Sequence, residues 1–263
     1  MKPRALILRT GGTNCDVETD FAFRQAGADT SRLHVNVLRD NPDRLMDFAI
    51  LAVPGGFSYG DDLGAGKVLA NELLTHLRPA LEQFVEEGRL IIGICNGFQV
   101  LVKTGLLPGI NRWQQEATLT FNDSHKFEDR WTYLKAPSSR SVLVEDGESI
   151  YLPVAHAEGK FVCEDASTLQ RLSDNGQVVF RYVDPEGRAA GYPWNPNGSV
   201  DNIAAICDPT GRVLCMMPHP ERHVLPYQHP RWTREGLKDE GDGLRIFRRA
   251  VNFAERELSI GAV

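Results

Sequence analysis

The stretch "LIIGICNGFQVL" (Leu90–Leu101) joins an aliphatic run to an amphipathic one through a short turn. Leu90–Ile94 has the composition of a buried strand, and the residues after Cys95 have helical spacing. Gly93 and Gly97 flank Cys95 at two residues on either side. This pattern has the form of the nucleophile elbow, G-x-S-x-G, with sulfur in place of oxygen. The stretch therefore predicts an α/β fold that carries Cys95 between a strand and a helix.

Apolar runs and helical patterns alternate along the N-terminal half of the chain. Such an alternation favours right-handed βαβ crossovers, and hence a mainly parallel open sheet with helices on both faces. The expected strands are 4–10, 32–38, 48–53 and 89–94, and the expected helices are 15–26, 68–87 and 97–103.

The sequence pattern changes between about residues 113 and 180, where short β-rich runs alternate with polar turns. We expect these runs to form an antiparallel addition to the sheet and not a separate domain. Residues 202–221 resemble a β-hairpin around the turn 208–211. We therefore expect one domain over residues 1–263, with 224–243 as an extended loop or tail insertion and 244–257 as a closing helix.

Composition excludes several classes of protein. The 263 residues carry a formal charge of −6, and no basic run with interleaved aromatics is present, so nucleic acid is not an expected partner. No apolar run approaches the roughly 20 residues of a membrane span, and the N-terminus has the pattern of a first strand and not of a signal peptide. The expected compartment is the cytoplasm. The five cysteines form no C-x-x-C pair, which argues against a disulfide framework or a zinc ribbon.

A sharp turn explains the two glycines around Cys95. The turn crowds the positions two before and two after the nucleophile, where only very small side chains fit. The positive end of the following helix favours a thiolate, and the N–H of Asn96 is free to bind an oxyanion. The alternative is a buried core cysteine beside a glycine-rich turn.

A partner histidine occurs in "MMPHPER" (Met216–Arg222). His219 follows a buried run, and Pro220 disposes it to extended geometry, which places Glu221 on the same side. A histidine that accepts the thiol proton and a carboxylate that orients it complete a triad. The alternatives are a loop histidine and a solvated surface carboxylate. A metal site at His219 and His223 is disfavoured, because H-P-E-R-H is not H-E-x-x-H and Pro220 opposes the helix which that motif needs.

Together these motifs resemble the class I glutamine amidotransferases with a Cys-His-Glu triad. The closer resemblance is to the glutaminase components of phosphoribosylformylglycinamidine synthase. It covers most of the chain and is carried by "GGTNCDVE" (11–18), "PGGFSYGDDLGAG" (54–66), "GICNGFQVL" (93–101), "HAEGKF" (156–161) and the stretch from "GYPWNPNGSVDN" (191–202) to "MMPHPER" (216–222). "PGGFSYGD" and "YPWNPNGS" are far more specific than the elbow alone.

The resemblance implies roles for the triad. Cys95 would attack the side-chain carboxamide of L-glutamine to form a γ-glutamyl thioester. His219 would accept the thiol proton and protonate the departing ammonia, and Glu221 would orient His219.

The resemblance also implies residues that bind the oxyanion and the substrate. The loop Gly55, Gly56 and Phe57 would supply a second oxyanion N–H beside that of Asn96. Gln99, one helical turn beyond Cys95, would face the pocket and contact glutamine.

"FNDSHKFE" (121–128) resembles the segment that holds the amino-acid end of glutamine. Ser124 and Phe127 are its candidates, with ordinary loop residues as the alternative. His156 and Glu158 would lie near the active site and the partner interface, where they either help pass ammonia or belong to a structural hairpin.

No cofactor is expected in this chain. "GDDLGAGKV" (60–68) fails the P-loop pattern twice, with Asp61 at the first glycine position and Val68 after the lysine. ATP and magnesium are expected on a separate synthetase subunit, because nothing here resembles a domain that binds a ribonucleotide and ATP. A small accessory subunit is a further possible partner. The segment 224–243 is longer than in the shortest family members and is expected at the surface or interface, with a solvated loop as the alternative.

Three rival functions stay open from the sequence. The first is a glutaminase that feeds a different ammonia acceptor. The second is a non-catalytic regulatory subunit on the same fold. The third is a cysteine hydrolase that acts on another acyl substrate.

Overall fold

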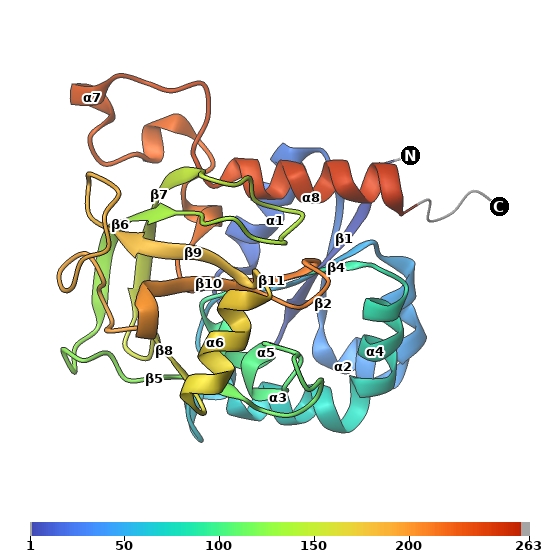
Figure 1. The fold of residues 1–263 in the computed structure, drawn as a ribbon. Coiled ribbons are helices and arrows are strands. Elements are labelled where there is room, and N and C mark those ends of the chain that lie inside the picture. Colours follow the sequence, from blue (N-terminus) through green and yellow to red (C-terminus); the bar gives the residue numbers. More distant parts are fainter. Residues whose placement is uncertain (1, 259–263) are drawn as a thin grey trace.

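A nine-stranded sheet with the strand order β2-β1-β3-β4-β11-β10-β9-β6-β7 forms the centre of the molecule (Figure 1). This computed structural model describes residues 2–258. The strands β2, β1, β3, β4 and β11 are parallel to one another. The other four strands, β10, β9, β6 and β7, pair antiparallel with their neighbours. The strands of this sheet are β1 (Arg4–Arg9), β2 (Asp29–His34), β3 (Ile50–Val53), β4 (Leu90–Ile94), β6 (Glu128–Lys135), β7 (Ser149–His156), β9 (Val178–Val183), β10 (Ile203–Cys207) and β11 (Val213–Met216). The predicted α/β class, with a mainly parallel sheet and an antiparallel addition, is confirmed.

Helices cover both faces of the sheet, with α1 and α8 on one face and α3, α4 and α5 on the other (Figure 1). The apolar stripe of α8 packs on α1, where Phe23 and Phe247 meet edge to face with ring centroids 4.9 Å apart. The helices are α1 (Asp16–Ala26), α2 (Val35–Asp40), α3 (Lys67–Glu72), α4 (Arg78–Glu86), α5 (Asn96–Lys103), α6 (Ala166–Asp174), α7 (Trp232–Glu235) and α8 (Leu244–Glu257). None of the helices within residues 2–258 is both long and apolar enough to cross a membrane.

Two details of the predicted strands are wrong. The strand expected over 32–38 ends at His34, where α2 begins. The His34 imidazole accepts a hydrogen bond from the N–H of Asn36 at 3.2 Å and so caps that helix. The buried Val35 and Leu38 fit a helical face as well as they fit an alternating strand. In the β-rich region, β5 (Ala117–Thr120) does not join the large sheet but pairs with β8 (Lys160–Cys163) in a two-stranded sheet.

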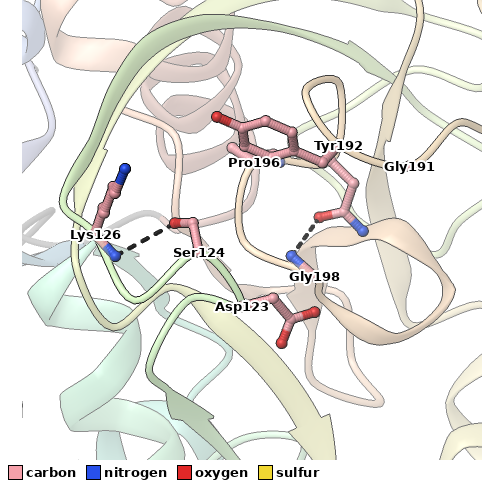
Figure 2. A pocket seen from close by; sticks show the side chains of 8 residues that line it. Asp123, Ser124, Lys126, Gly191, Tyr192, Pro196 and Gly198 are labelled. Atoms are coloured by element: carbon pink, nitrogen blue, oxygen red, sulfur yellow. Dashed lines mark hydrogen bonds between the residues drawn. The ribbon is translucent and has the colours of Figure 1, made fainter.

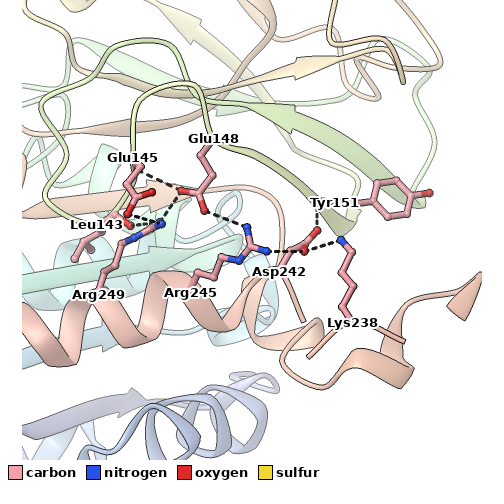
Figure 3. Close-up of polar contacts among 8 residues, drawn as sticks. All are labelled: Leu143, Glu145, Glu148, Tyr151, Lys238, Asp242, Arg245 and Arg249. Atoms are coloured by element: carbon pink, nitrogen blue, oxygen red, sulfur yellow. Dashed lines mark hydrogen bonds and ion pairs between the residues drawn. The ribbon is translucent and has the colours of Figure 1, made fainter. Parts of the chain in front are cut away.

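Polar contacts fasten α8 and the segment before it to the β7 end of the sheet (Figure 3). The Asp242 carboxylate accepts hydrogen bonds from the N–H of Tyr151 at 3.0 Å and from Lys238 at 2.9 Å. Glu148, whose side chain is 6% exposed, pairs with Arg249 at 2.5 Å. The segment 224–243 contains only a 3₁₀ turn (Pro226–Gln228) and the short α7. Its position is therefore set by side-chain contacts and by backbone hydrogen bonds, such as the one from the N–H of Gly241 to the carbonyl of Val224, and not by long helices.

Candidate active site

Cys95 lies at the turn between β4 and α5, in the strained backbone that the sequence predicts. Its φ of 51° is in a region that residues with a side chain rarely occupy. A Cβ at Gly97 would overlap the carbonyl oxygen of Val53, and one at Gly93 would lie 2.5 Å from Sγ of Cys215. Both flanking glycines are therefore required by close packing against the neighbouring strands β3 and β11.

His219 follows β11 and is held from two sides. Its backbone N–H donates to the carbonyl of Pro153 at 2.8 Å, and its Nδ1 lies 2.6 Å from Oε1 of Glu221. Both side chains are about 1% exposed, and Nε2 of His219 has no hydrogen-bond partner among residues 2–258. Burial by itself disfavours the imidazolium, but the Glu221 carboxylate and the neighbouring Cys95 raise the pKa of His219 well above its usual range. Such a histidine is suited to accept a proton from a thiol.

Cys95 and His219 meet around Gly55, in a pocket of about 250 Å³. A Cβ at Gly55 would lie 2.9 Å from Cε1 of His219, 3.1 Å from Sγ of Cys15 and 3.4 Å from Cβ of Cys95. The Cys95 thiol also faces the carbonyl of Ala155, with 3.7 Å between sulfur and oxygen. The pocket is lined by Asn14, Cys15, Gly56, Phe57, Cys95, Phe127, Asp129, Ala155, His219 and Arg222.

The loop at residues 55–57 borders this pocket, but its N–H groups are not equivalent. The N–H of Phe57 donates to the carbonyl of Gly12 at 2.9 Å, so it is already occupied. This bond belongs to a bridge between Thr13 and Gly56 in which the N–H of Gly56 takes no part. Asn96 is the first residue of α5, where an α-helix leaves its N–H groups without internal partners. The N–H groups of Gly56 and Asn96 are therefore the ones left to bind an oxyanion, whereas Phe57 lines the pocket with its N–H already occupied.

The side chains of Asn96 and Gln99 join the loops that surround Cys95. The Asn96 amide accepts from the N–H of Ser58 at 3.1 Å and donates to Gln99 at 2.9 Å. Gln99 in turn donates to the carbonyl of Glu158 at 2.6 Å and is 4% exposed. Gln99 is not among the residues that line the pocket. The direct contact between Gln99 and substrate stays a prediction, and in the folded chain the Gln99 amide bonds to Asn96 and to the Glu158 carbonyl.

Residues 121–128 contribute side chains to two different pockets. Phe127 is 51% exposed and lines the catalytic pocket. Ser124 lines a neighbouring pocket of about 520 Å³ together with Tyr192 and Gly198 (Figure 2). Its hydroxyl donates to Glu128 at 2.7 Å, which leaves Ser124 outside the cavity that contains Cys95.

His156 lies in the interior behind the catalytic pocket. Its Nδ1 is 3.2 Å from the amide oxygen of Asn122, and a Cβ at Gly159 would overlap its ring. Burial, with a smaller effect of His219, lowers the pKa of His156 to about 3, so the imidazole is neutral. The carbonyl of Glu158 accepts the bond from Gln99. These contacts give the loop a structural role.

The two histidines considered for a metal site, His219 and His223, have separate partners. His223 bonds through Nδ1 to the carbonyl of Tyr151 at 2.8 Å, and its ring packs edge to face on Trp131. Within residues 2–258, His223 is in no cluster of potential metal ligands with His219.

Cys15, Asp129 and Arg222 line the pocket although the sequence motifs did not single them out. A guanidinium N–H of Arg222 donates to Sγ of Cys15 at 3.1 Å. One signal was available for Cys15: it follows the carboxyl end of β1, and ligand sites in parallel sheets collect at that edge. Asp129 lies within a strand, and its position follows only from the tertiary structure.

Comparisons with known proteins agree with this geometry. Residues 2–254 match the model of the CobB/CobQ-like glutamine amidotransferase domain. A phosphoribosylformylglycinamidine synthase subunit PurQ from Dehalococcoides mccartyi is 52% identical over 257 residues, which cover 97% of this chain and 99% of the relative. The PurQ subunit of Archaeoglobus fulgidus is 44% identical, covering 96% and 97%.

A solved structure is also similar to this chain. The structure of PurLQS from Thermotoga maritima contains a chain with a TM-score of 0.73 and 32% sequence identity to this one, covering 96% of this chain and 99% of that one. The chain therefore belongs to the CobB/CobQ-like glutamine amidotransferases, in the family of the PurQ subunits of phosphoribosylformylglycinamidine synthase.

Proposed function

We propose that this chain is the glutaminase subunit of phosphoribosylformylglycinamidine synthase in purine (IMP) biosynthesis. It hydrolyses L-glutamine to glutamate and ammonia and supplies the ammonia to a separate ATP-dependent synthetase subunit. The observation that carries the proposal is the meeting of Cys95 with the buried His219–Glu221 pair around Gly55. The similarity to PurQ subunits supports the acceptor reaction.

In the first half of the reaction, His219 accepts the thiol proton of Cys95 through Nε2. The thiolate attacks the carboxamide carbon of glutamine, and the oxyanion lies against the N–H groups of Asn96 and Gly56. Collapse of this intermediate breaks the C–N bond as His219 returns its proton to the nitrogen, which leaves as ammonia. The product is a γ-glutamyl thioester on Cys95.

In the second half, His219 removes a proton from a water molecule that attacks the thioester carbon. A second oxyanion forms, the C–S bond breaks, and the proton returns to the sulfur of Cys95 as glutamate leaves. Glu221 holds Nδ1 of His219 throughout, so that Nε2 faces the reacting atoms. No step needs a metal or a redox cofactor in this chain, and ATP and magnesium are assigned to the synthetase.

Exposed aromatic side chains around the pocket support the synthetase as partner. Phe57 and Phe127 line the catalytic pocket and are 48% and 51% exposed. Phe121 and Tyr192 are exposed on the adjoining loops. Large exposed apolar groups beside a pocket favour a protein interface. A partner at this rim would also keep ammonia from escaping into water. We assign the assembly to the cytoplasm and treat residues 1–263 as one amidotransferase domain, and a small accessory subunit would complete the complex.

The test is an assay of glutamine turnover with the synthetase subunit present, for wild type, Cys95→Ala and His219→Ala. Both substitutions are expected to abolish glutamine-dependent synthesis and to preserve synthesis from added ammonium. Cys163→Ala, which changes a half-buried cysteine of β8, serves as the matched control. Glutamine turnover that survives Cys95→Ala contradicts the mechanism.

The same assay separates the rival functions. Glutamine turnover without product from this synthetase would indicate another acceptor. No turnover in any form would indicate a regulatory subunit. Turnover of esters or peptides without glutamine dependence would indicate another acyl substrate.

A further inference from the structure

Residues 58–66 link the loop at residues 55–57 to α3, and the mechanism does not use them. This segment begins with a turn in which Tyr59, Gly60 and Asp61 have φ values of 53°, 71° and 54°. Residues with a side chain rarely occupy this left-handed region, and such residues cluster at functional sites where their surroundings hold them in place. The contacts of Asp61 show what holds this turn.

One carboxylate oxygen of the half-buried Asp61 accepts two hydrogen bonds. Its Oδ1 accepts from the N–H of Gly66 at 3.2 Å, which closes the segment on itself. The same atom accepts from the side-chain amide of Asn96 at 3.2 Å, which ties the segment to the elbow. Burial raises the pKa of Asp61, and the two hydrogen bonds and the charge of Lys103 partly offset this effect. The carboxylate is therefore drawn partly out of water and oriented by two donors.

The Asn96 side chain is held by both ends of the turn at residues 58–61. Its Oδ1 accepts from the N–H of Ser58, and its Nδ2 donates to Asp61 and to Gln99. Because an N–H can only donate and an ionised carboxylate can only accept, Ser58 and Asp61 fix the two ends of the Asn96 amide. Asn96 is also the first residue of α5 and carries one of the two N–H groups left for the oxyanion. A shift of its side chain therefore reaches the turn that binds the oxyanion.

We propose that Asp61 is a positioning residue for glutamine hydrolysis, which acts through the Asn96 side chain to hold the oxyanion N–H groups in place. This role rests on the proposed glutaminase function. Asp61 is not among the residues that line the catalytic pocket, so it contacts neither the substrate nor the nucleophile. Its loss should therefore lower kcat and leave KM for glutamine nearly unchanged.

The test measures steady-state glutamine hydrolysis by the complex with the synthetase. Asp61→Gly removes the carboxylate, and glycine accepts the left-handed backbone without strain. We expect kcat to fall by about tenfold or more at nearly constant KM. Asp61→Asn keeps an oxygen that accepts both hydrogen bonds, so it should restore most of the activity. Asp62→Gly, at the exposed neighbouring carboxylate, is the matched control and should retain wild-type kinetics.

Two further measurements separate positioning from a loss of stability. Synthesis from added ammonium bypasses Cys95 and should be unchanged in Asp61→Gly. Alkylation of Cys95 by iodoacetamide, followed by mass spectrometry, involves no oxyanion, so its rate should match that of wild type. If either rate falls as far as glutamine hydrolysis does, Asp61 only supports the fold or the nucleophile, and the proposal is overturned.

A double-mutant cycle tests whether Asp61 acts through Asn96. In an Asn96→Ala background, Asp61→Gly should lower kcat by no more than about twofold, because the contact is already lost. Losses that multiply would show independent effects and overturn the proposal. If Asp61→Gly does not fold, Asp61→Ala takes its place in every assay.

The two hypotheses fail in different ways. An active wild type with full activity in Asp61→Gly, or without rescue by Asp61→Asn, overturns only the role of Asp61. A wild-type complex that hydrolyses no glutamine overturns the proposed function, and the role of Asp61 with it.

Discussion

The side-chain oxygen of Asn96 accepts a hydrogen bond from the N–H of Ser58 across 3.1 Å and so joins the elbow to the segment that follows the loop at residues 55–57. Both residues are about 2% exposed. Asn96→Ala would leave the buried N–H of Ser58 unpaired, which costs about 1–3 kcal/mol and frees the loop to shift. We expect kcat for glutamine to fall by about tenfold to a hundredfold. Activity with ammonium should be unchanged. Equal losses with both nitrogen sources would show that Asn96 only stabilises the complex.

Gln99 tests whether this network positions the site or binds substrate. Because its amide bonds to Asn96 and to the Glu158 carbonyl, Gln99→Leu should lower kcat and leave KM for glutamine nearly unchanged. Steady-state kinetics of the complex measure both constants. A large increase in KM at constant kcat would instead support the direct contact between Gln99 and substrate that the sequence predicts.

Glu221→Gln keeps the shape of the side chain but removes its charge. The His219 imidazole then loses the group that raises its pKa and holds its tautomer, so we expect kcat to fall by about 10³ to 10⁴. The pKa that controls glutamine hydrolysis should move down. A pH profile of kcat/KM for the complex measures this shift. Full activity in Glu221→Gln would remove Glu221 from the triad.

Because His156 is buried and neutral, we expect the free energy of unfolding to fall in acid. Its pKa is about 3 in the folded chain because of burial, whereas a histidine in the unfolded chain has a pKa of about 6.5. Below about pH 6.5 the unfolded chain therefore binds a proton that the folded chain does not, and stability falls by about 1.4 kcal/mol per pH unit. Between pH 7 and 5 this amounts to about 2 kcal/mol. Urea unfolding at both pH values should show a correspondingly smaller loss in His156→Gln, and an equal loss would contradict the assignment.

We expect the ion pair of Arg249 to stabilise the packing of α8 on the rest of the fold. Its guanidinium pairs with the nearly buried Glu148 (Figure 3), so Arg249→Leu leaves that carboxylate with fewer partners. We expect the free energy of unfolding to fall by about 2 kcal/mol, measured by urea unfolding. Arg256→Leu, on the exposed side of the same helix, is the matched control and should leave the unfolding midpoint unchanged. Equal midpoints for the two variants would show that the contact with Glu148 is not stabilising.

Local patterns were sufficient for most of the architecture. The apolar runs at β1, β3 and β4 and the helical spacing of α1, α5 and α8 are set within a few residues, so periodicity predicts them. The G-x-C-x-G pattern of the elbow is also visible in the sequence, although the atoms that exclude a Cβ at Gly93 and Gly97 belong to Cys215 and Val53 on neighbouring strands. Prediction failed at α2, where one capping imidazole outweighs an alternating pattern, and at β5, whose partner strand is distant in the chain.

The sequence by itself predicted Cys95 as the nucleophile with His219 and Glu221 as its partners, since the pattern around each residue is local. Only the tertiary structure decided what surrounds them. In the folded chain, Cys15 and Arg222 line the pocket. The N–H of Phe57 donates to the carbonyl of Gly12, and the Gln99 amide donates to the carbonyl of Glu158. These outcomes depend on loops from separate strands that meet at one edge of the sheet. Distances between residues far apart in the chain follow from packing, and no short motif encodes them.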